Sequence, residues 1–458
     1  MIRELHISRF MKEKVSFLAA LARDMVQTLP GLAEDFSGEG PEEIDDRDVA
    51  ELVTSMEALD ADPTLWEPTD NWHPRNANAA ILQSCLDEYY RENDAVQLDQ
   101  ASKGIVIPER NIYGESLRQD ILTSANLVNQ SSTGRRVGKF RLNKRDPRWV
   151  LVLRAKAIKR RRGIPRFPDN SGQSTPLDSR ARMVLVGDWG SGLPGAVQLA
   201  GKIWKSHLQP DVGSKDLHVV HLGDVYHAGL ASDYRKNFLK DWPVPIGQES
   251  AVASWCLAGN HDMYSGGHGY FNMLKDQRFF RQNQSSYFLM ENDHWQVFGL
   301  DTSFDPRDFS GDIGELYGEQ AAWVAQKRAA TPDKKCLILT HHQPISAYDV
   351  VKENLERRLR PIQTNGQIDA WFWGHEHLCA VYDSYEKIRY PVLLGHGGFP
   401  EKPKIKRLGA PPINYEWLTV DTQGFVLFGF AVLDFDGAKI DVRLVDENDV
   451  QQHSFTIA

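Results

Sequence analysis

Short apolar runs, each followed by a turn rich in Gly, Asp or His, recur along the second half of the chain. Residues 183–186 (MVLV) form such a run before GDWGSG, and the stretch at 196–208 that follows has helical character. Further runs predict strands at 217–222, 255–258, 335–339, 368–373 and 391–394. Short apolar runs between turn residues are typical of buried strands, and their combination with helices favours an α/β fold.

The region past residue 400 has a different pattern, which predicts β structure alone. Strands are expected at 415–420, 425–434 and 440–445. Asp436-Gly437 separates the last two, and Asp-Gly between two strand-like runs is a hairpin turn signal.

The first part of the chain predicts a separate accessory region. Residues 1–145 are expected to be mainly helical, with helical periodicity at 15–26 and 79–90 around an acidic, hydrated stretch at 34–70. Residues 146–180 predict a linker, basic at 154–166 (RAKAIKRRRGIPR) and then rich in Pro, Ser and Gly. The basic cluster is expected to be solvated or docked on the acidic stretch, with a site for phosphate or nucleic acid as the alternative. Residues 181–458 form the second domain.

Composition narrows the function classes. The 458 residues are 41% hydrophobic and 25% charged, which excludes disordered, collagen-like and coiled-coil chains. The net charge of −9 disfavours nucleic acid as the main ligand. No apolar run approaches the roughly 20 residues that cross a bilayer, and the N-terminus lacks a signal-peptide core. We therefore expect a cytoplasmic protein without a membrane partner.

The cysteines and the absence of cofactor motifs narrow the possible function classes further. The four cysteines are widely spaced and are expected to be buried thiols without disulfides: Cys85, Cys256, Cys336 and Cys379. No GxGxxG, P-loop, GxSxG or CxxC motif is present, so nucleotide-cofactor, serine-hydrolase and zinc-finger classes have no support.

Five predicted strands end in side chains that suit divalent cations. In chain order these are Asp188; Asp224 and His227; Asn260, His261 and Asp262; His341 and His342; and His375 and His377. Carboxylate, carboxamide and imidazole groups are all ligands for such metals. Ligands bind at the carboxyl ends of strands in α/β sheets, so the joint pattern predicts a metal site there.

These blocks resemble the motif series of the calcineurin-like metallophosphoesterases. The chain carries GDWG at 187–190, GD at 223–224, GNHD at 259–262, HQP at 342–344 and GHEH at 374–377, in the family's order over about 190 residues. The resemblance covers roughly residues 182–458. It implies a sandwich of two mixed β-sheets flanked by helices, and hydrolysis of a phosphate ester at a dinuclear metal centre.

The resemblance also implies a role for each matched residue. Asp224 would bridge two metals, Asp188 and His377 would serve the first, and Asn260, His342 and His375 the second. A hydroxide between the metals would attack phosphorus, and His261 would donate a proton to the leaving oxygen. Asp262 would orient His261. Mn, Fe, Zn or Ni fits such nitrogen and oxygen ligands.

The first motif block departs from the main pattern, because Gly190 stands where many members have a ligating His. The purple acid phosphatases share this glycine and supply a Tyr three residues after the bridging Asp. This chain has His227 there, which predicts a purple-acid-phosphatase-like branch in which His replaces Tyr, with Tyr226 as the rival ligand. In the adjacent pair, the H-x-P register selects His342, with His341 beside the pocket or in the core.

The remaining candidates and alternatives rest on weaker signals. Trp189, Tyr264, His268, His341 and His396 are candidate pocket residues. The substrate is open between monoesters and diesters. The alternatives to such a phosphoesterase are a nuclease that uses the 154–166 segment and an idle metal-bound scaffold that recruits a protein partner through its N-terminal region.

Overall fold

The computed structural model describes residues 155, 159, 162–169, 174–226, 228–305, 314–349, 351, 355, 368–421 and 424–458. The chain divides into two compact units, Met1–Gly163 and Ile164–Ala458, and the described residues lie almost wholly in the second. The predicted N-terminal helices, the acidic stretch, Cys85, His227 and part of the basic cluster lie outside the described residues.

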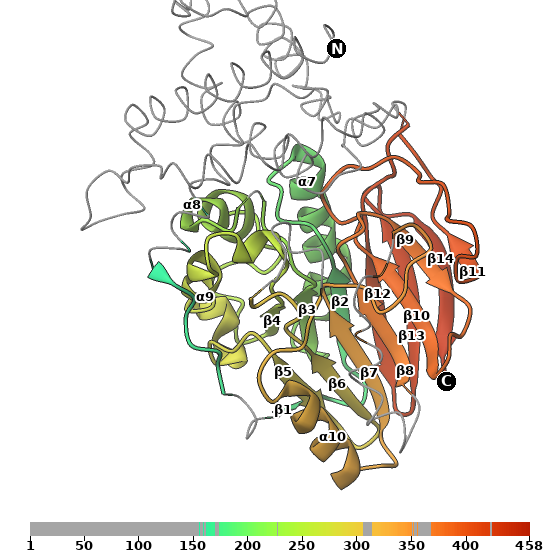
Figure 1. The fold of residues 1–458 in the computed structure, drawn as a ribbon, viewed down its shortest axis with the longest axis horizontal. Helices are drawn as coiled ribbons and strands as arrows, with labels where there is room; N and C mark the ends of the chain where they lie inside the picture. The colour runs from blue at the N-terminus through green and yellow to red at the C-terminus, as the bar shows by residue number, and fades with distance from the viewer. Residues whose placement is uncertain are drawn as a thin grey trace, which may run out of the picture. The chain divides into compact units, whose positions relative to one another are not determined.

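A six-stranded sheet carries the first half of the metal motifs. Its strand order is β14-β13-β12-β2-β3-β4 (Figure 1). The strands are β2 (Arg182–Val186), β3 (Leu217–His221), β4 (Val252–Cys256), β12 (Gly429–Asp436), β13 (Lys439–Asp446) and β14 (Gln451–Ile457). β2, β3 and β4 are parallel, whereas β12 pairs antiparallel with both β2 and β13.

An eight-stranded sheet carries the second half of the metal motifs. Its strand order is β1-β5-β6-β7-β8-β10-β9-β11. Its strands are β1 (Thr175–Pro176), β5 (Phe288–Glu291), β6 (Trp295–Gly299), β7 (Lys335–Thr340), β8 (Ile368–Trp373), β9 (Cys379–Tyr382), β10 (Ile388–Leu394) and β11 (Ile413–Glu416). β6, β7, β8 and β10 are parallel, and β9 pairs antiparallel with β10 and β11. The predicted pair of mixed sheets is therefore confirmed.

Alternation along β2 explains how the two layers pack. Met183 and Leu185 belong to the core between the sheets, with residues of β7, β8 and β10. Val184 and Val186 point to the opposite face, where they join a second core with helical residues. Successive strand residues face opposite sides of a sheet, so a strand that is apolar throughout is buried on both.

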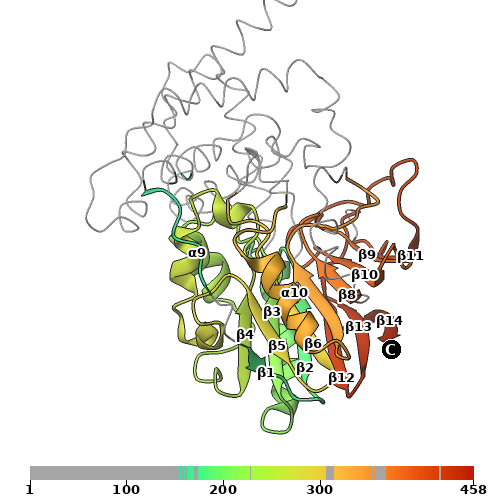
Figure 2. The same cartoon turned by 60° about the horizontal axis from the view of Figure 1, so that its bottom comes forward.

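Helices cover the outer faces of both sheets (Figures 1 and 2). The six-stranded sheet is flanked by α7 (Pro194–Lys202) with the π-helical η5 (Ile203–Leu208), by α8 (Ala231–Asp233) with η7 (Tyr234–Leu239), and by α9 (His268–Met273). Shorter turns are η6 (Gln209–Asp211), η8 (His261–Met263) and η9 (Gln277–Gln282). On the other sheet, Trp323 of α10 (Gln320–Ala330) packs on Phe298 of β6. No helix among these described segments is long and apolar enough to span a membrane.

Most predicted strands are confirmed, and the differences have local causes. The run at 425–434 was expected to be one strand, but β12 begins at Gly429. The amides of Phe425, Leu427 and Phe428 are bonded to Asp421, Thr419 and Glu447, which takes this segment out of the ladder. β1, β5, β6, β9 and β14 were not predicted, and of the strand predicted at 415–420 only residues 415–416 lie in β11. Cys256, Cys336 and Cys379 are buried thiols, as expected.

Candidate metal centre at the strand ends

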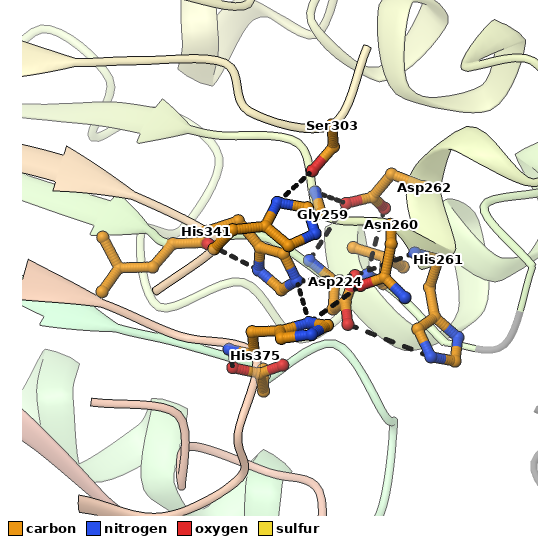
Figure 3. Close-up of polar contacts among 12 residues, drawn as sticks. Asp224, Gly259, Asn260, His261, Asp262, Ser303, His341 and His375 are labelled. Carbon is orange, nitrogen blue, oxygen red and sulfur yellow. Dashed lines mark hydrogen bonds and ion pairs between the residues drawn. The ribbon is translucent and has the colours of Figure 1, made fainter. Parts of the chain in front are cut away.

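The carboxyl ends of five strands bring the predicted ligands together. Asp188 follows β2, Asp224 follows β3, Asn260 follows β4, His341 follows β7, and His375 follows β8. The strands of each set are parallel neighbours, so their ends lie at the same edge of their sheet. Figure 3 shows side chains from both sheets converging on one cluster.

The backbone at four of these positions is left-handed. φ is 55° at Asp188, 71° at Asp224, 72° at His375 and 55° at His377. Only eight non-glycine residues with positive φ occur in the part of the chain that the structure describes, and half of them are predicted ligands. Such conformations cost on the order of 1–3 kcal/mol each and gather at functional sites.

Glycines at the strand ends let the turns of neighbouring strands approach one another closely. A Cβ on Gly259 would lie 2.0 Å from Oδ1 of Asp224, and one on Gly374 would lie 2.6 Å from Oδ2 of Asp188. The glycine that precedes Asn260 thus makes room for a carboxylate from the neighbouring strand, and the glycine before His375 does the same for Asp188.

One half of the cluster is formed by Asp188, Tyr226 and His377. The Tyr226 hydroxyl donates to Oδ1 of Asp188 at 3.0 Å and lies 2.9 Å from Nε2 of His377. Nε2 of His377 is 3.5 Å from the same carboxylate oxygen. The backbone N–H of His375 donates to the other oxygen, Oδ2, at 2.8 Å. Tyr226 therefore fills the space between two predicted ligands of the first metal.

The other half is centred on His341 (Figure 3). Its Nε2 lies 3.0 Å from Oδ1 of Asn260, 3.5 Å from Oδ1 of Asp224 and 3.2 Å from Nδ1 of His375. Its Nδ1 lies 3.0 Å from the carbonyl oxygen of Leu222. A carbonyl only accepts hydrogen bonds, so the His341 proton is on Nδ1 and Nε2 presents a lone pair.

This half of the cluster fits a cation. The Asn260 amide nitrogen donates to the Tyr264 hydroxyl at 2.9 Å, which turns its oxygen toward His341. Burial holds the pKa of His341 well below its usual range, so the ring is neutral. Two acceptor atoms, Nε2 of His341 and Oδ1 of Asn260, thus face each other beside the Asp224 carboxylate with no proton between them. A metal ion satisfies such an arrangement.

The two buried carboxylates, Asp188 and Asp224, also indicate a bound cation. Burial raises the pKa of Asp188 to about 8, and burial together with the neighbouring Asp188 charge raises the pKa of Asp224 well above its usual range. Single ligand atoms of Asp188, Asp224 and His341 lie within 4.8 Å of one another. Ionising two adjacent buried carboxylates without a cation is costly, whereas a bound dication compensates both charges.

His342 lies in the same cluster with a different environment. Ligand atoms of His341, His342 and His375 fall within 4.8 Å of one another. Nδ1 of His342 lies 2.9 Å from Oγ1 of Thr302 and 3.4 Å from Oγ of Ser303. The contacts of His341 with Asp224 and Asn260 favour it as the ligand, whereas the motif register selects His342.

The two residues predicted to act on protons are placed differently. Nε2 of His261 lies 4.0 Å from Oδ2 of Asp224, at the edge of the cluster. The Asp262 carboxylate instead accepts from the backbone N–H groups of Asp224, Val225 and Gly259, at 2.7–3.0 Å, and from the hydroxyl of Tyr234. Asp262 thereby connects the turn after β3 to the turn after β4. Its position next to His261 in the sequence did not indicate this role.

The weaker pocket candidates are spread over several environments. Trp189 is buried among Phe238 and Trp242, and its indole donates to a helix carbonyl. Tyr264 contacts the cluster through Asn260 and packs beside His261. His396 is buried against Trp417. His268 begins α9.

Three contacting residues were missed by the sequence reasoning. Thr302 and Ser303 follow β6, a strand that was not predicted, so no signal marked their loop as a strand end. Tyr234 lies in a helical segment, and only the fold brings its hydroxyl to Asp262.

Comparison with known proteins agrees with this arrangement. Residues 181–379 match the family described as Calcineurin-like phosphoesterase. This segment is a calcineurin-like phosphoesterase domain. The domain therefore includes all five strand ends that form the cluster.

One curated relative is a probable glycerophosphodiester phosphodiesterase, GpdQ, of Arcobacter nitrofigilis. It is 26% identical over 180 residues, which are 39% of this chain and 55% of the relative, so the chain spans about half of that protein's length. Among solved structures, GAP50, the anchor in the inner membrane complex of Plasmodium, is 12% identical over 61% of this chain and 88% of its own, with a TM-score of 0.45. A predicted phosphoesterase of Streptococcus pneumoniae is 11% identical over 60% of this chain and 97% of its own, with a TM-score of 0.26.

The raised pKa of Asp188 predicts that metal stabilises the protein more as the pH rises. In metal-free protein the folded-state pKa, about 8, exceeds the ordinary value of 3.8, so ionisation of the unfolded chain lowers stability as pH increases toward about 8. Metal binding needs the carboxylate ionised, which is also favoured at higher pH. The increase in Tm on adding Mn²⁺ to chelator-treated protein should be larger near pH 8 than near pH 6. An equal or smaller increase near pH 8 would contradict this assignment.

Gly259→Ala is expected to weaken metal binding, because the new Cβ would overlap Oδ1 of Asp224. The increase in Tm caused by Mn²⁺ should fall by at least half. Gly201→Ala is the matched control, since its Cβ meets no atom within 4 Å in helix α7. The control should keep the full metal response, and a Gly259→Ala response equal to that of the control would count against the close approach.

Proposed function

We propose that residues 181–458 hydrolyse a phosphate ester at a pair of divalent cations held by the strand-end cluster. The observation that carries this proposal is the meeting of Nε2 of His341 with Oδ1 of Asn260 at 3.0 Å and with Oδ1 of Asp224 at 3.5 Å. The calcineurin-like phosphoesterase domain supports it independently.

The contacts divide the proposed ligands into two sets that share Asp224. Asp188, Tyr226 and His377 would hold the first cation, because the Tyr226 hydroxyl lies 3.0 Å from Asp188 and 2.9 Å from His377. Asn260, His341 and His375 would hold the second. The purple-acid-phosphatase-like branch remains part of the proposal, with an oxygen ligand from Tyr226 in place of the expected His227 nitrogen.

The cations, when bound, would neutralise charge on the phosphoryl oxygens and activate water. The surrounding residues fix the ligands in the required state. The Leu222 carbonyl sets the tautomer of His341, and Tyr264 orients the amide of Asn260. Asp262 ties together the backbone of the turns that carry Asp224 and Asn260. Partners of this kind tune metal ligands in many enzymes.

His261 is proposed to protonate the leaving group. Its imidazole lies at the rim of the cluster, packed between the rings of Tyr226 and Tyr264, and its own backbone N–H donates to Asp224 at 3.0 Å. In the proposed reaction water adds to phosphorus and releases one proton to the solvent, the ester P–O bond breaks, and the departing oxygen takes its proton from His261. His261 then takes up a proton from the solvent.

A diester is the favoured substrate class. The curated relative is named a probable glycerophosphodiester phosphodiesterase, although the chain spans only about half of it. A nuclease that uses residues 154–166 is the alternative phosphodiesterase, and an idle scaffold is the outcome that absence of turnover in the experiments below would reveal.

Asp224→Asn tests the shared ligand. Metal-stripped protein reloaded with Mn²⁺ should hydrolyse bis-p-nitrophenyl phosphate faster than p-nitrophenyl phosphate. The variant should lose at least about a hundredfold in kcat, since it removes the charge between the two cations. Wild-type protein that carries metal yet turns over neither ester would contradict the proposed function.

His261→Gln tests the proton donor through its dependence on the leaving group. With an alkyl phosphodiester kcat should fall by about 10²–10⁴-fold, because an alkoxide needs a proton to leave. With a p-nitrophenyl ester the loss should be much smaller, because p-nitrophenolate leaves unprotonated. His294→Gln, at an exposed histidine outside the cluster, is the control. Equal losses on both esters would exclude the donor role.

A further inference from the structure

The loop between β10 and β11 contains a basic segment with exposed aliphatic side chains. Residues 402–412 (KPKIKRLGAPP), here named the basic loop, hold Lys402, Lys404, Lys406 and Arg407 and no acidic residue. Ile405 is 90% exposed and Leu408 fully exposed, the two highest values among the large hydrophobic residues that the structure describes. In Figure 2 the orange chain joining β10 to β11 extends away from the strands.

The exposure does not come from a loose tail, because the residues directly before Leu408 are anchored to the rest of the domain. The backbone N–H of Arg407 donates to the Ala347 carbonyl at 2.8 Å, and its guanidinium donates to the Ser346 carbonyl at 2.9 Å. Lys406 forms an ion pair with Glu416 at 2.8 Å. Three prolines in the segment restrict the chain further. The fold therefore presents Ile405 and Leu408 to solvent in a defined conformation.

The same loop borders the candidate metal centre. Nζ of Lys404 lies 3.5 Å from the carbonyl oxygen of Glu376, the residue between His375 and His377. The Glu376 carboxylate accepts from the hydroxyl of Ser346, whose carbonyl anchors Arg407. Adjacent residues, Lys404 and Ile405, thus connect the edge of the cluster with the solvent-exposed tip.

We propose that the basic loop docks on an anionic phospholipid surface. Ile405 and Leu408 would enter the boundary between headgroups and acyl chains. Lys406, whose side chain is 49% exposed beside its partner Glu416, would lie at the level of the lipid phosphates, whereas Lys404 faces Asp349 at 3.6 Å and stays on the protein side. Binding to a membrane surface scales with buried apolar area plus attraction between basic residues and anionic lipid. Combined with the proposed function, on which this last step rests, docking assigns lipid-borne phosphate esters as the substrate class.

The composition of the loop favours a bilayer over a protein partner. The cores of protein interfaces are enriched in aromatic residues and depleted in lysine, whereas the basic loop has three lysines and no aromatic residue. Isolated aliphatic side chains among cations match the layered chemistry of a lipid surface. This inference departs from the expectation, drawn from the sequence, that the chain has no membrane partner.

Co-sedimentation of the full chain with lipid vesicles tests the proposal. Wild-type protein should bind vesicles of equal parts phosphatidylcholine and phosphatidylglycerol, should bind phosphatidylcholine alone much less, and should be released by salt. The double variant I405S/L408S should lose at least about tenfold in partition coefficient, because two aliphatic side chains no longer leave water. Ile246→Ser, at a position 73% exposed elsewhere on the domain, is the matched control and should bind like wild type.

Two results would overturn the docking proposal. The first is wild-type protein that binds neither kind of vesicle, which is expected for a loop that contacts another protein. The second is a double variant that binds vesicles like wild type. Turnover of soluble p-nitrophenyl esters is measured in parallel and should be unchanged in I405S/L408S. Vesicle binding without turnover in any variant would support docking and remove the proposed function, so the two can fail separately.

Discussion

The close approach of two buried carboxylates, Asp188 and Asp224, is the constraint on which the arrangement of the domain depends. Ligand atoms of both lie within 4.8 Å of each other and of His341, and burial raises the pKa of each. Such a group of acceptors is stable only with a compensating cation or with protons. The fold holds it through left-handed backbone at the ligands and through glycines that leave no side chain between adjacent turns.

Two sheets are needed to build this cluster. The six-stranded sheet supplies the carboxylates and Asn260, and the eight-stranded sheet supplies His341, His375 and His377. Hydrogen bonds across the gap, such as His341 to the Leu222 carbonyl and the His375 amide to Asp188, fix one sheet's turns against the other's. The shared core of Leu185, Leu337 and Trp371 keeps these edges in register. The structure thus links the packing of the sandwich to the spacing of the candidate ligands.

The sequence predicted the strand ends because buried parallel strands are continuous apolar runs and their turns need Gly followed by polar residues. Between adjacent side chains it selected His342 over His341 and His227 over Tyr226 from motif position alone. His341 and His342 both follow β7, and their roles depend on which meets Leu222 and which meets Thr302, residues far away along the chain. Tyr226 was ranked below His227, yet its hydroxyl lies between Asp188 and His377. Asp262 was assigned to His261 from adjacency, whereas the turn of η8 directs its carboxylate to backbone amides. β14 was not predicted because its mainly polar sequence contains no apolar run.

We propose that His341, rather than its neighbour His342, completes a two-cation centre with Asp224 and Asn260. The most direct measurement is the number of manganese ions per chain, determined by elemental analysis after reloading and gel filtration, for wild type, His341→Ala and His342→Ala. We expect two ions in the wild type, a loss of at least one in His341→Ala, and two in His342→Ala, with all three proteins folded by circular dichroism. A wild type that retains no manganese, or a loss confined to His342→Ala, would contradict it.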